Sequence, residues 1–151
     1  MSCSICRSNE GTARISPGPP IYEGRHWLVE HAYPSALLGW LVIVLRRHAE
    51  ALHELSRAEA EELGTLQWAV AKLLRSETSC LKEYSVFFAE APGFQHVHVH
   101  MVPRGPDLPT DFRGGRVFGL LQIPPEEAVP REAVAAFCSR ASVEVASLLD
   151  R

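Results

Sequence analysis

The chain has 151 residues, of which 46% are hydrophobic and 22% are charged, and its formal net charge is −3. One domain per roughly 150 residues is usual, and this composition is typical of a globular protein rather than a disordered one. The slight acidic excess offers no broad basic surface for a nucleic acid, so no nucleic-acid partner is expected. A small phosphate site remains compatible with these counts, because it needs only local donors.

Neither a membrane span nor a secretory signal is visible in the sequence. The longest dense apolar stretch, residues 36–45, is about half of the roughly 20 residues that a span requires. The first residues, MSCSICR, lack a basic segment followed by an apolar run. We therefore expect a cytoplasmic protein.

The four cysteines fit a reducing compartment. Cys3 and Cys6 form a C-x-x-C motif, which in that setting indicates metal binding or redox chemistry rather than a structural disulfide. Two thiols on a frayed terminus are the alternative interpretation. Cys80 and Cys138 stand alone and are expected to be small buried apolar residues.

Apolar patterning predicts several strands after an N-terminal loop at residues 9–20. The segment 39–45 (GWLVIVL) is nearly all apolar and predicts a buried central strand, whereas 95–102 (QHVHVHMV) alternates and predicts a strand with one buried face. The remaining predicted strands cover residues 21–23, 26–31, 83–89 and 117–123.

Two helices are predicted. The first spans about residues 57–75: Ser56 and Glu59 form a capping box, and an apolar face follows at helical spacing. That face consists of Leu63, Leu66, Val70 and Leu73. The second spans about residues 131–149 after Pro130, and its apolar stripe includes Val134, Phe137, Ala141, Val145 and Leu148. The order of elements predicts an α+β protein with an antiparallel sheet of about five strands, one long helix and a C-terminal helix.

Three of the seven histidines lie within five residues, at His96, His98 and His100. In a strand these alternate positions share one face, about 6.6 Å apart, while Val97 and Val99 point into the core. A neutral imidazole is a nucleophile, a proton carrier and a metal ligand near neutral pH. Solvated histidines on an exposed strand face are the alternative. A metal site made only from the three is geometrically awkward, because in-line positions do not converge on a tetrahedral ion.

The segment 96–102 (HVHVHMV) resembles the signature of the histidine triad (HIT) family, H-φ-H-φ-H-φ-φ with φ apolar. The upstream segment 39–48 (GWLVIVLRRH) is similar to that family's G-H-x-L-V-x-P-K-x-H stretch. The likeness covers about residues 3–104. It implies a HIT domain at 1–104, with 105–151 as a C-terminal extension packed on the same domain.

The resemblance implies a nucleotide hydrolase or nucleotidyl transferase acting at an α-phosphate, through a nucleotidyl-histidine on His98. Diadenosine polyphosphates and adenosine phosphoramidates are the substrate classes that it suggests. His100 would polarise the phosphate, with His96 beside it. Gly93, Phe94 and Gln95 would supply phosphate contacts through backbone N–H groups, since glycine lets a backbone approach a ligand closely.

Some members of this family hold zinc with an N-terminal C-x-x-C, the histidine that ends the basic stretch and the first histidine of the triad. Here those positions are Cys3, Cys6, His48 and His96. Such a Cys₂His₂ set suits a closed tetrahedral structural zinc. On this interpretation His96 is a ligand and not a catalyst.

Several positions depart from the family pattern. Trp40 replaces a second active-site histidine and cannot accept a proton; it would wall the pocket, stack on a base or belong to the core. The ribose-binding acid or amide is replaced by one of Glu30, His31 or Ala32. The leading hypothesis is nonetheless an enzyme. The alternatives are a non-catalytic, zinc-stabilised nucleotide-binding module, and a transferase with an unknown acceptor. Many members of the family are homodimers, and the long helix with Trp68 offers a contact surface for one. A core role for both the helix and Trp68 is the alternative.

Overall fold

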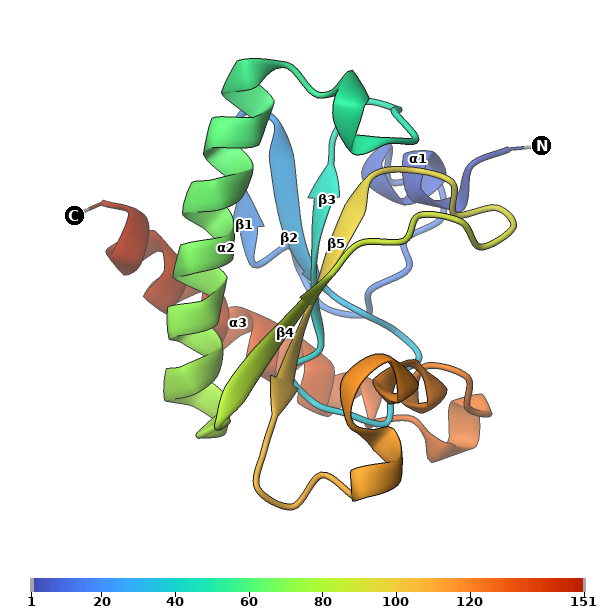
Figure 1. Cartoon of the computed structure of the whole chain (residues 1–151), viewed down its shortest axis with the longest axis vertical. Helices are drawn as coiled ribbons and strands as arrows, with labels where there is room; N and C mark the ends of the chain where they lie inside the picture. Colours follow the sequence, from blue (N-terminus) through green and yellow to red (C-terminus); the bar gives the residue numbers. More distant parts are fainter. Residues whose placement is uncertain (1, 151) are drawn as a thin grey trace.

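The computed structural model describes residues 2–150, and its centre is a five-stranded antiparallel sheet in the order β1-β2-β3-β5-β4 (Figure 1). The strands are β1 (Tyr22–Glu23), β2 (Trp27–His31), β3 (Leu41–Leu45), β4 (Lys82–Val86) and β5 (His98–Arg104). The long helix α2 (Arg57–Thr78) and the C-terminal helix α3 (Arg131–Leu149) pack against the sheet and against each other, and α1 (Ser4–Asn9) lies across the sheet from α2. The predicted α+β class is confirmed.

The alternation of side chains along the strands divides the protein into two layers. Leu41, Ile43 and Leu45 of β3, with Val99 and Met101 of β5, join the main core beneath α2 and α3. The intervening residues of these strands face the opposite side of the sheet, where α1 and the segment after β5 lie. Because β3 is covered on both sides, its sequence is apolar throughout, as expected for a central strand.

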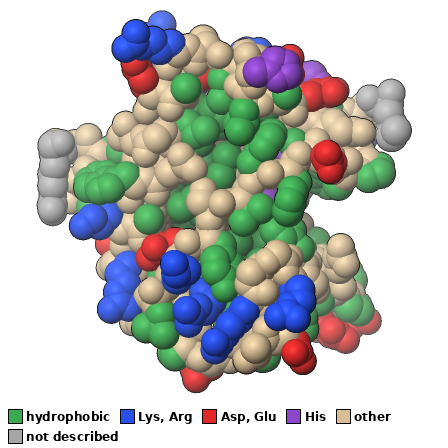
Figure 2. Space-filling view, viewed as in Figure 1, with side chains coloured by type: hydrophobic (Ala, Val, Ile, Leu, Met, Phe, Trp, Pro, Cys, Tyr) green, Lys and Arg blue, Asp and Glu red, His purple; other side chains and the backbone are tan. Residues whose placement is uncertain are grey.

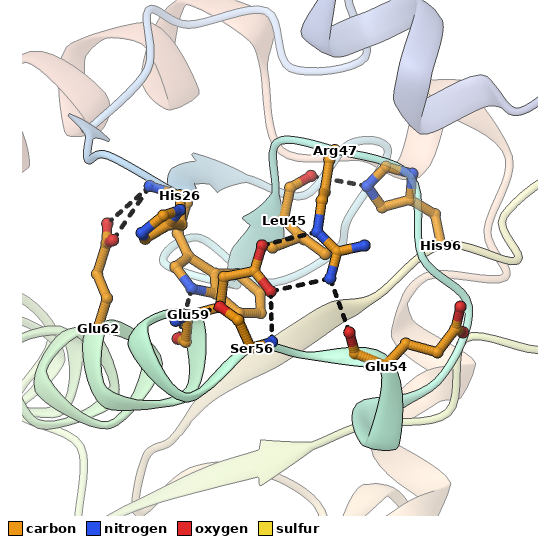
Figure 3. A network of polar contacts seen from close by, with 9 residues as sticks. His26, Leu45, Arg47, Glu54, Ser56, Glu59, Glu62 and His96 are labelled. Atoms are coloured by element: carbon orange, nitrogen blue, oxygen red, sulfur yellow. Dashed lines mark hydrogen bonds and ion pairs between the residues drawn. The ribbon is translucent and has the colours of Figure 1, made fainter.

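Helix α2 begins at the predicted capping box. The Ser56 hydroxyl accepts from the Glu59 backbone N–H at 3.2 Å, and the Glu59 carboxylate accepts from the Ser56 N–H at 2.8 Å. The same carboxylate accepts two bonds from Arg47, at 2.7 and 2.9 Å (Figure 3). This arrangement ties the helix start to the residue that precedes His48. The helix continues to Thr78, three residues past the predicted end, and Ser79 closes it in the left-handed conformation.

Helix α3 has the predicted bounds and buries Val134, Phe137, Ala141 and Val145. Cys80 and Cys138 are fully buried, as expected. The domain boundary at residue 104 stays a prediction.

The predicted strand at 117–123 is wrong. The segment instead forms the 3₁₀ helix η3 (Gly114–Leu120), after a short η2 (Thr110–Phe112). Its glycine-rich start allows a tight turn, and Val117 is buried while Phe118 packs on Trp40 and His100. The apolar residues therefore cover the sheet face instead of extending the sheet. No helix within residues 2–150 is long and apolar enough to cross a membrane.

Candidate functional site

A cavity of about 490 Å³ lies on the sheet face opposite α2. Five parts of the chain meet at its walls: α1, β2, β3, the segment between β4 and β5 together with β5 itself, and η3. Representative wall residues are Ile5, Glu30, Val44, Phe94, His98 and Phe118. A largely apolar cavity with a few polar groups is the usual form of a small-molecule site.

His98 lies at the start of β5 and lines this cavity. Its Nδ1–H donates to the backbone carbonyl of His96 at 2.6 Å. A neutral imidazole with its proton on Nδ1 carries a lone pair on Nε2. Burial lowers the pKa of His98 below its usual value, which favours the neutral ring. Within the described chain Nε2 has no hydrogen-bond partner, which leaves it free to act as a nucleophile.

His100 lines the same cavity two residues further along β5, and the two imidazole centroids are 4.9 Å apart. Trp40 Nε1–H donates to His100 Nδ1 at 3.0 Å. Burial, and then the neighbouring His98, lower the pKa of His100 to about 3. The row therefore presents two neutral imidazoles to the cavity.

Trp40 itself is placed behind His100 rather than at the cavity wall, in contrast to the substrate contact expected from the sequence. The indole is fully buried in a small second core with Val102, Leu108 and Val117. Its bulk and apolar surface explain this position, because the η3 segment folds over it.

The third histidine of the row, His96, is fully buried and turns away from the cavity toward the N-terminus. Its Nδ1 lies 3.5 Å from the sulfurs of both Cys3 and Cys6, and His48 Nδ1 lies 3.5 Å from Cys6 Sγ. All four ligand atoms lie within 4.8 Å of one another. Zinc bonds of about 2.3 Å to sulfur and 2.0–2.1 Å to nitrogen place a tetrahedral S···N pair about 3.5 Å apart. The donor set and its spacing fit zinc, so Cys3, Cys6, His48 and His96 form a structural zinc site.

Outer contacts orient these ligands. His96 Nε2–H donates to the Leu45 carbonyl at 2.7 Å, so Nδ1 keeps the lone pair that a metal requires (Figure 3). His48 Nε2 lies 3.4 Å from a Glu50 carboxylate oxygen, the usual second partner of a metal-binding imidazole. Burial and the adjacent Cys3 thiol raise the pKa of Cys6 to about 11. That thiol therefore needs a cation beside it to become the thiolate that ligates metal.

In the turn before the histidine row, two of the backbone N–H groups expected to bind phosphate already have hydrogen-bond partners within the protein. Gly93 has φ +81°, and its N–H donates to the Gln95 side chain at 3.3 Å, while Phe94 N–H donates to the Ala91 carbonyl at 2.8 Å. Phe94 lines the cavity and Gln95 is exposed. Phosphate binding by Gly93, Phe94 and Gln95 stays a prediction, and it requires these bonds to rearrange.

The sequence left open which of Glu30, His31 and Ala32 takes the ribose-binding position, and all three line the cavity. Glu30 lines the cavity while its carboxylate forms an ion pair with Arg14, from the N-terminal loop. Ala32 lines the same wall and supplies no polar side chain. His31 is structural: its Nδ1–H donates to the Ala32 carbonyl at 2.7 Å, and its Nε2 accepts from Gly39 N–H at 2.9 Å. An isolated histidine at the end of an apolar strand was the only sequence signal for that role.

A zinc-held N-terminus beside a row of neutral histidines on an antiparallel sheet defines the class of this protein. Residues 4–115 match the family model described as "Scavenger mRNA decapping enzyme C-term binding". The match covers most of the chain, and the chain belongs to the histidine triad family, in its zinc-binding subset.

Solved structures agree on the fold. A zinc-bound histidine triad family protein from Mycobacterium smegmatis is 20% identical, with a TM-score of 0.69 and 97% of each chain covered. A hypothetical histidine triad nucleotide-binding protein from Sulfolobus tokodaii is 16% identical, with a TM-score of 0.73, covering 97% of this chain and 93% of that one. A histidine triad protein from Bradyrhizobium japonicum is 23% identical, with a TM-score of 0.70 and coverage of 84% and 90%. No curated protein matches the sequence.

Proposed function

We propose that this protein is a nucleotide hydrolase that acts at the α-phosphate of an adenosine-type nucleotide through His98. The observation that carries the proposal is the bond from His98 Nδ1–H to the His96 carbonyl. It directs the Nε2 lone pair of a neutral imidazole toward a cavity of about 490 Å³. Diadenosine polyphosphates and adenosine phosphoramidates are the proposed substrate classes.

In the first step His98 Nε2 attacks phosphorus, a P–Nε2 bond forms, and the bond from phosphorus to the leaving group breaks. The leaving group departs with the electron pair and takes up a proton. Water then attacks phosphorus, the P–Nε2 bond breaks, the nucleoside monophosphate leaves and a proton passes to solvent. Splitting one difficult displacement into two easier ones is the advantage of a covalent intermediate.

Charge distribution supports an anionic substrate. Lys and Arg side chains gather at the lower end of the face shown in Figure 2. This end holds the start of β4 and the end of β5, where Lys82 and Arg104 are partners across the sheet. The η3 segment, with Arg116, continues from there to the cavity wall at Phe118. This basic region lies outside the cavity lining, which includes no Lys or Arg within residues 2–150, and it would act by attracting a phosphorylated ligand toward this side of the protein despite the net charge of −3.

The test is release of AMP from a diadenosine polyphosphate and from an adenosine phosphoramidate. We include an mRNA cap dinucleotide because the family description names decapping. His98→Ala should lower kcat by at least about 10³-fold while nucleotide still binds. His53→Ala, which removes an exposed histidine on the short η1 (Leu52–Glu54), is the matched control and should behave as wild type.

The second candidate is a zinc-stabilised nucleotide-binding module without turnover. The apolar side chain of Ala32 at the cavity wall favours it, because a ribose contact is then missing there. Nucleotide binding by folded, zinc-loaded protein, with no release from any of the three substrates, would select this candidate over the hydrolase.

A further inference from the structure

The surroundings of His100 carry an additional inference about Trp40. The bond from Trp40 Nε1–H to His100 Nδ1 is 3.0 Å long, and the indole that donates it is fully buried. The Phe118 ring packs edge-on against both partners, with centroid distances of 5.3 Å to Trp40 and 4.9 Å to His100. The two rings are therefore held in this relation by packing as well as by the hydrogen bond.

The indole nitrogen is a donor only. His100 Nδ1 must therefore accept, so it carries no hydrogen, and the single proton of the neutral ring lies on Nε2. A second proton on the ring would place an N–H group against the indole N–H. A histidine at position 40 would not fix the tautomer of His100, because an imidazole can either donate or accept.

We propose that Trp40 is a positioning residue that holds His100 in one tautomer, as a neutral Nε2–H donor directed at the cavity. The catalytic meaning of this arrangement rests on the proposed function. As His98 attacks phosphorus, negative charge grows on the phosphate oxygens, and a donor fixed in advance stabilises that charge without reorganising.

The other titratable groups around the cavity do not favour a charged His100. Burial lowers the pKa of His98, on the same strand, and it lowers the pKa of His31 on β2 to about 4. Two carboxylates line the same cavity, Glu30 on β2 and Glu90 between β4 and β5. Glu30 is paired with Arg14, and Glu90 is exposed to solvent. The shift of the His100 pKa to about 3 arises from burial and from His98.

The direct test is nitrogen NMR of histidine-labelled, zinc-loaded full-length protein, with the His100 signals assigned by their loss in His100→Gln. We expect a protonated Nε2 and an unprotonated Nδ1 throughout pH 5–8. A protonated Nδ1 in that range, in either the neutral or the charged ring, would overturn the proposal without any Trp40 variant.

Trp40→Phe then removes the donor and keeps an aromatic ring. Trp27→Phe is the matched control, because Trp27 is also fully buried and donates Nε1–H at 2.9 Å, but to the Glu59 carbonyl. In Trp40→Phe the His100 signals should spread over both tautomers, and kcat should fall about tenfold with KM within about twofold. Trp27→Phe should leave the His100 signals and kcat unchanged.

Wild-type nitrogen signals and wild-type kcat in Trp40→Phe would reject the positioning role. The spectrum does not depend on turnover, so the two proposals fail separately. A fixed Nε2–H tautomer in a protein that releases no nucleotide would count against the hydrolase alone.

Discussion

At the scale of single residues, hydrogen-bond partners assign a distinct state to each histidine of the row. A backbone carbonyl takes the Nε2–H of His96, another takes the Nδ1–H of His98, and an indole N–H occupies Nδ1 of His100. One ring thereby keeps the lone pair that zinc requires, the next has the free Nε2 that the proposed nucleophile needs, and the third carries the Nε2–H of the proposed donor. Three chemically identical residues acquire different roles because their surroundings fix different protons.

His31 leads to a prediction about pH and stability. Its pKa is lowered to about 4 because the ring is buried, whereas the unfolded chain has the ordinary value of 6.5. The unfolded state therefore binds more protons between pH 6.5 and 4, and the folded state loses stability as pH falls through that window. A shift of this size corresponds to roughly 3 kcal/mol.

Denaturant unfolding of wild type and His31→Gln between pH 4 and 7 tests this prediction. The variant should be less stable at pH 7, because the ring accepts from Gly39 N–H and packs edge-on against Phe137. Its free energy of unfolding should also depend less on pH in the window. If the free energy of unfolding changed with pH in the same way in the two proteins, the lowered pKa of His31 would be contradicted.

At the scale of elements, the start of α2 and the chain around His48 depend on one carboxylate. Glu59 completes the capping box and binds Arg47, the residue before His48. These contacts lower the pKa of Glu59 to about 2, with the Arg47 hydrogen bond as the largest cause. The helix N-terminus and the zinc-binding segment are thus joined by charge as well as by packing.

Glu59→Gln keeps an amide oxygen that can complete a capping box, but it removes the charge and replaces one of the two oxygens that accept from Arg47 by an NH₂ donor. We expect Tm to fall by about 2–4 °C at pH 7. Glu61→Gln is the control: its exposed pair with Arg57 is one helical turn apart, so its effect should be smaller. Calorimetry measures the change in Tm for each variant. Equal changes in Tm would show that the buried carboxylate of Glu59 contributes no more than the exposed one of Glu61.

At the scale of the whole molecule, zinc connects the N-terminus to the cavity. Helix α1 carries Cys6, its N-cap is Cys3, and three of its residues, Ile5, Ser8 and Asn9, line the cavity wall. Asn9 also donates to the Leu45 and Arg46 carbonyls, at 3.0 and 3.2 Å. A short helix of six residues has little stability alone, so the metal and these contacts hold the wall in place.

Cys6→Ser should therefore lose zinc, lower Tm and weaken nucleotide binding about tenfold. Cys80→Ala removes a buried thiol far from the cluster in sequence and should retain both metal and affinity. Metal analysis and binding titrations measure the two effects. Less than about a tenth of an equivalent of zinc in wild type purified without chelator would contradict the site.

The oligomeric state is also a property of the whole molecule. The homodimer expected from the family stays a prediction, and Trp68 is half exposed on α2, where such a contact would form.

Local sequence patterns were sufficient to predict most of the helices and strands. The capping box at Ser56 and the helical spacing in α2 and α3 are properties of neighbouring residues, and the structure confirms them. The strand predicted from residue 95 begins only at His98, because His96 precedes β5 and turns toward Cys3 and Cys6 instead of sharing the face of His98 and His100. The apolar run 117–123 was ambiguous, because its residues bury equally well in a strand or in a turn that folds over Trp40.

The sequence by itself determined the α+β class through its patterning, and the resemblance of its motifs to the histidine triad family pointed to the four zinc ligands. Only the tertiary structure decided which way each histidine points and which nitrogen holds its proton. Cys3 and His96 are 93 residues apart, and Trp40 and His100 are 60 apart, yet each pair is in contact. A proton's position depends on the partner across space, and the packing of the whole chain selects that partner.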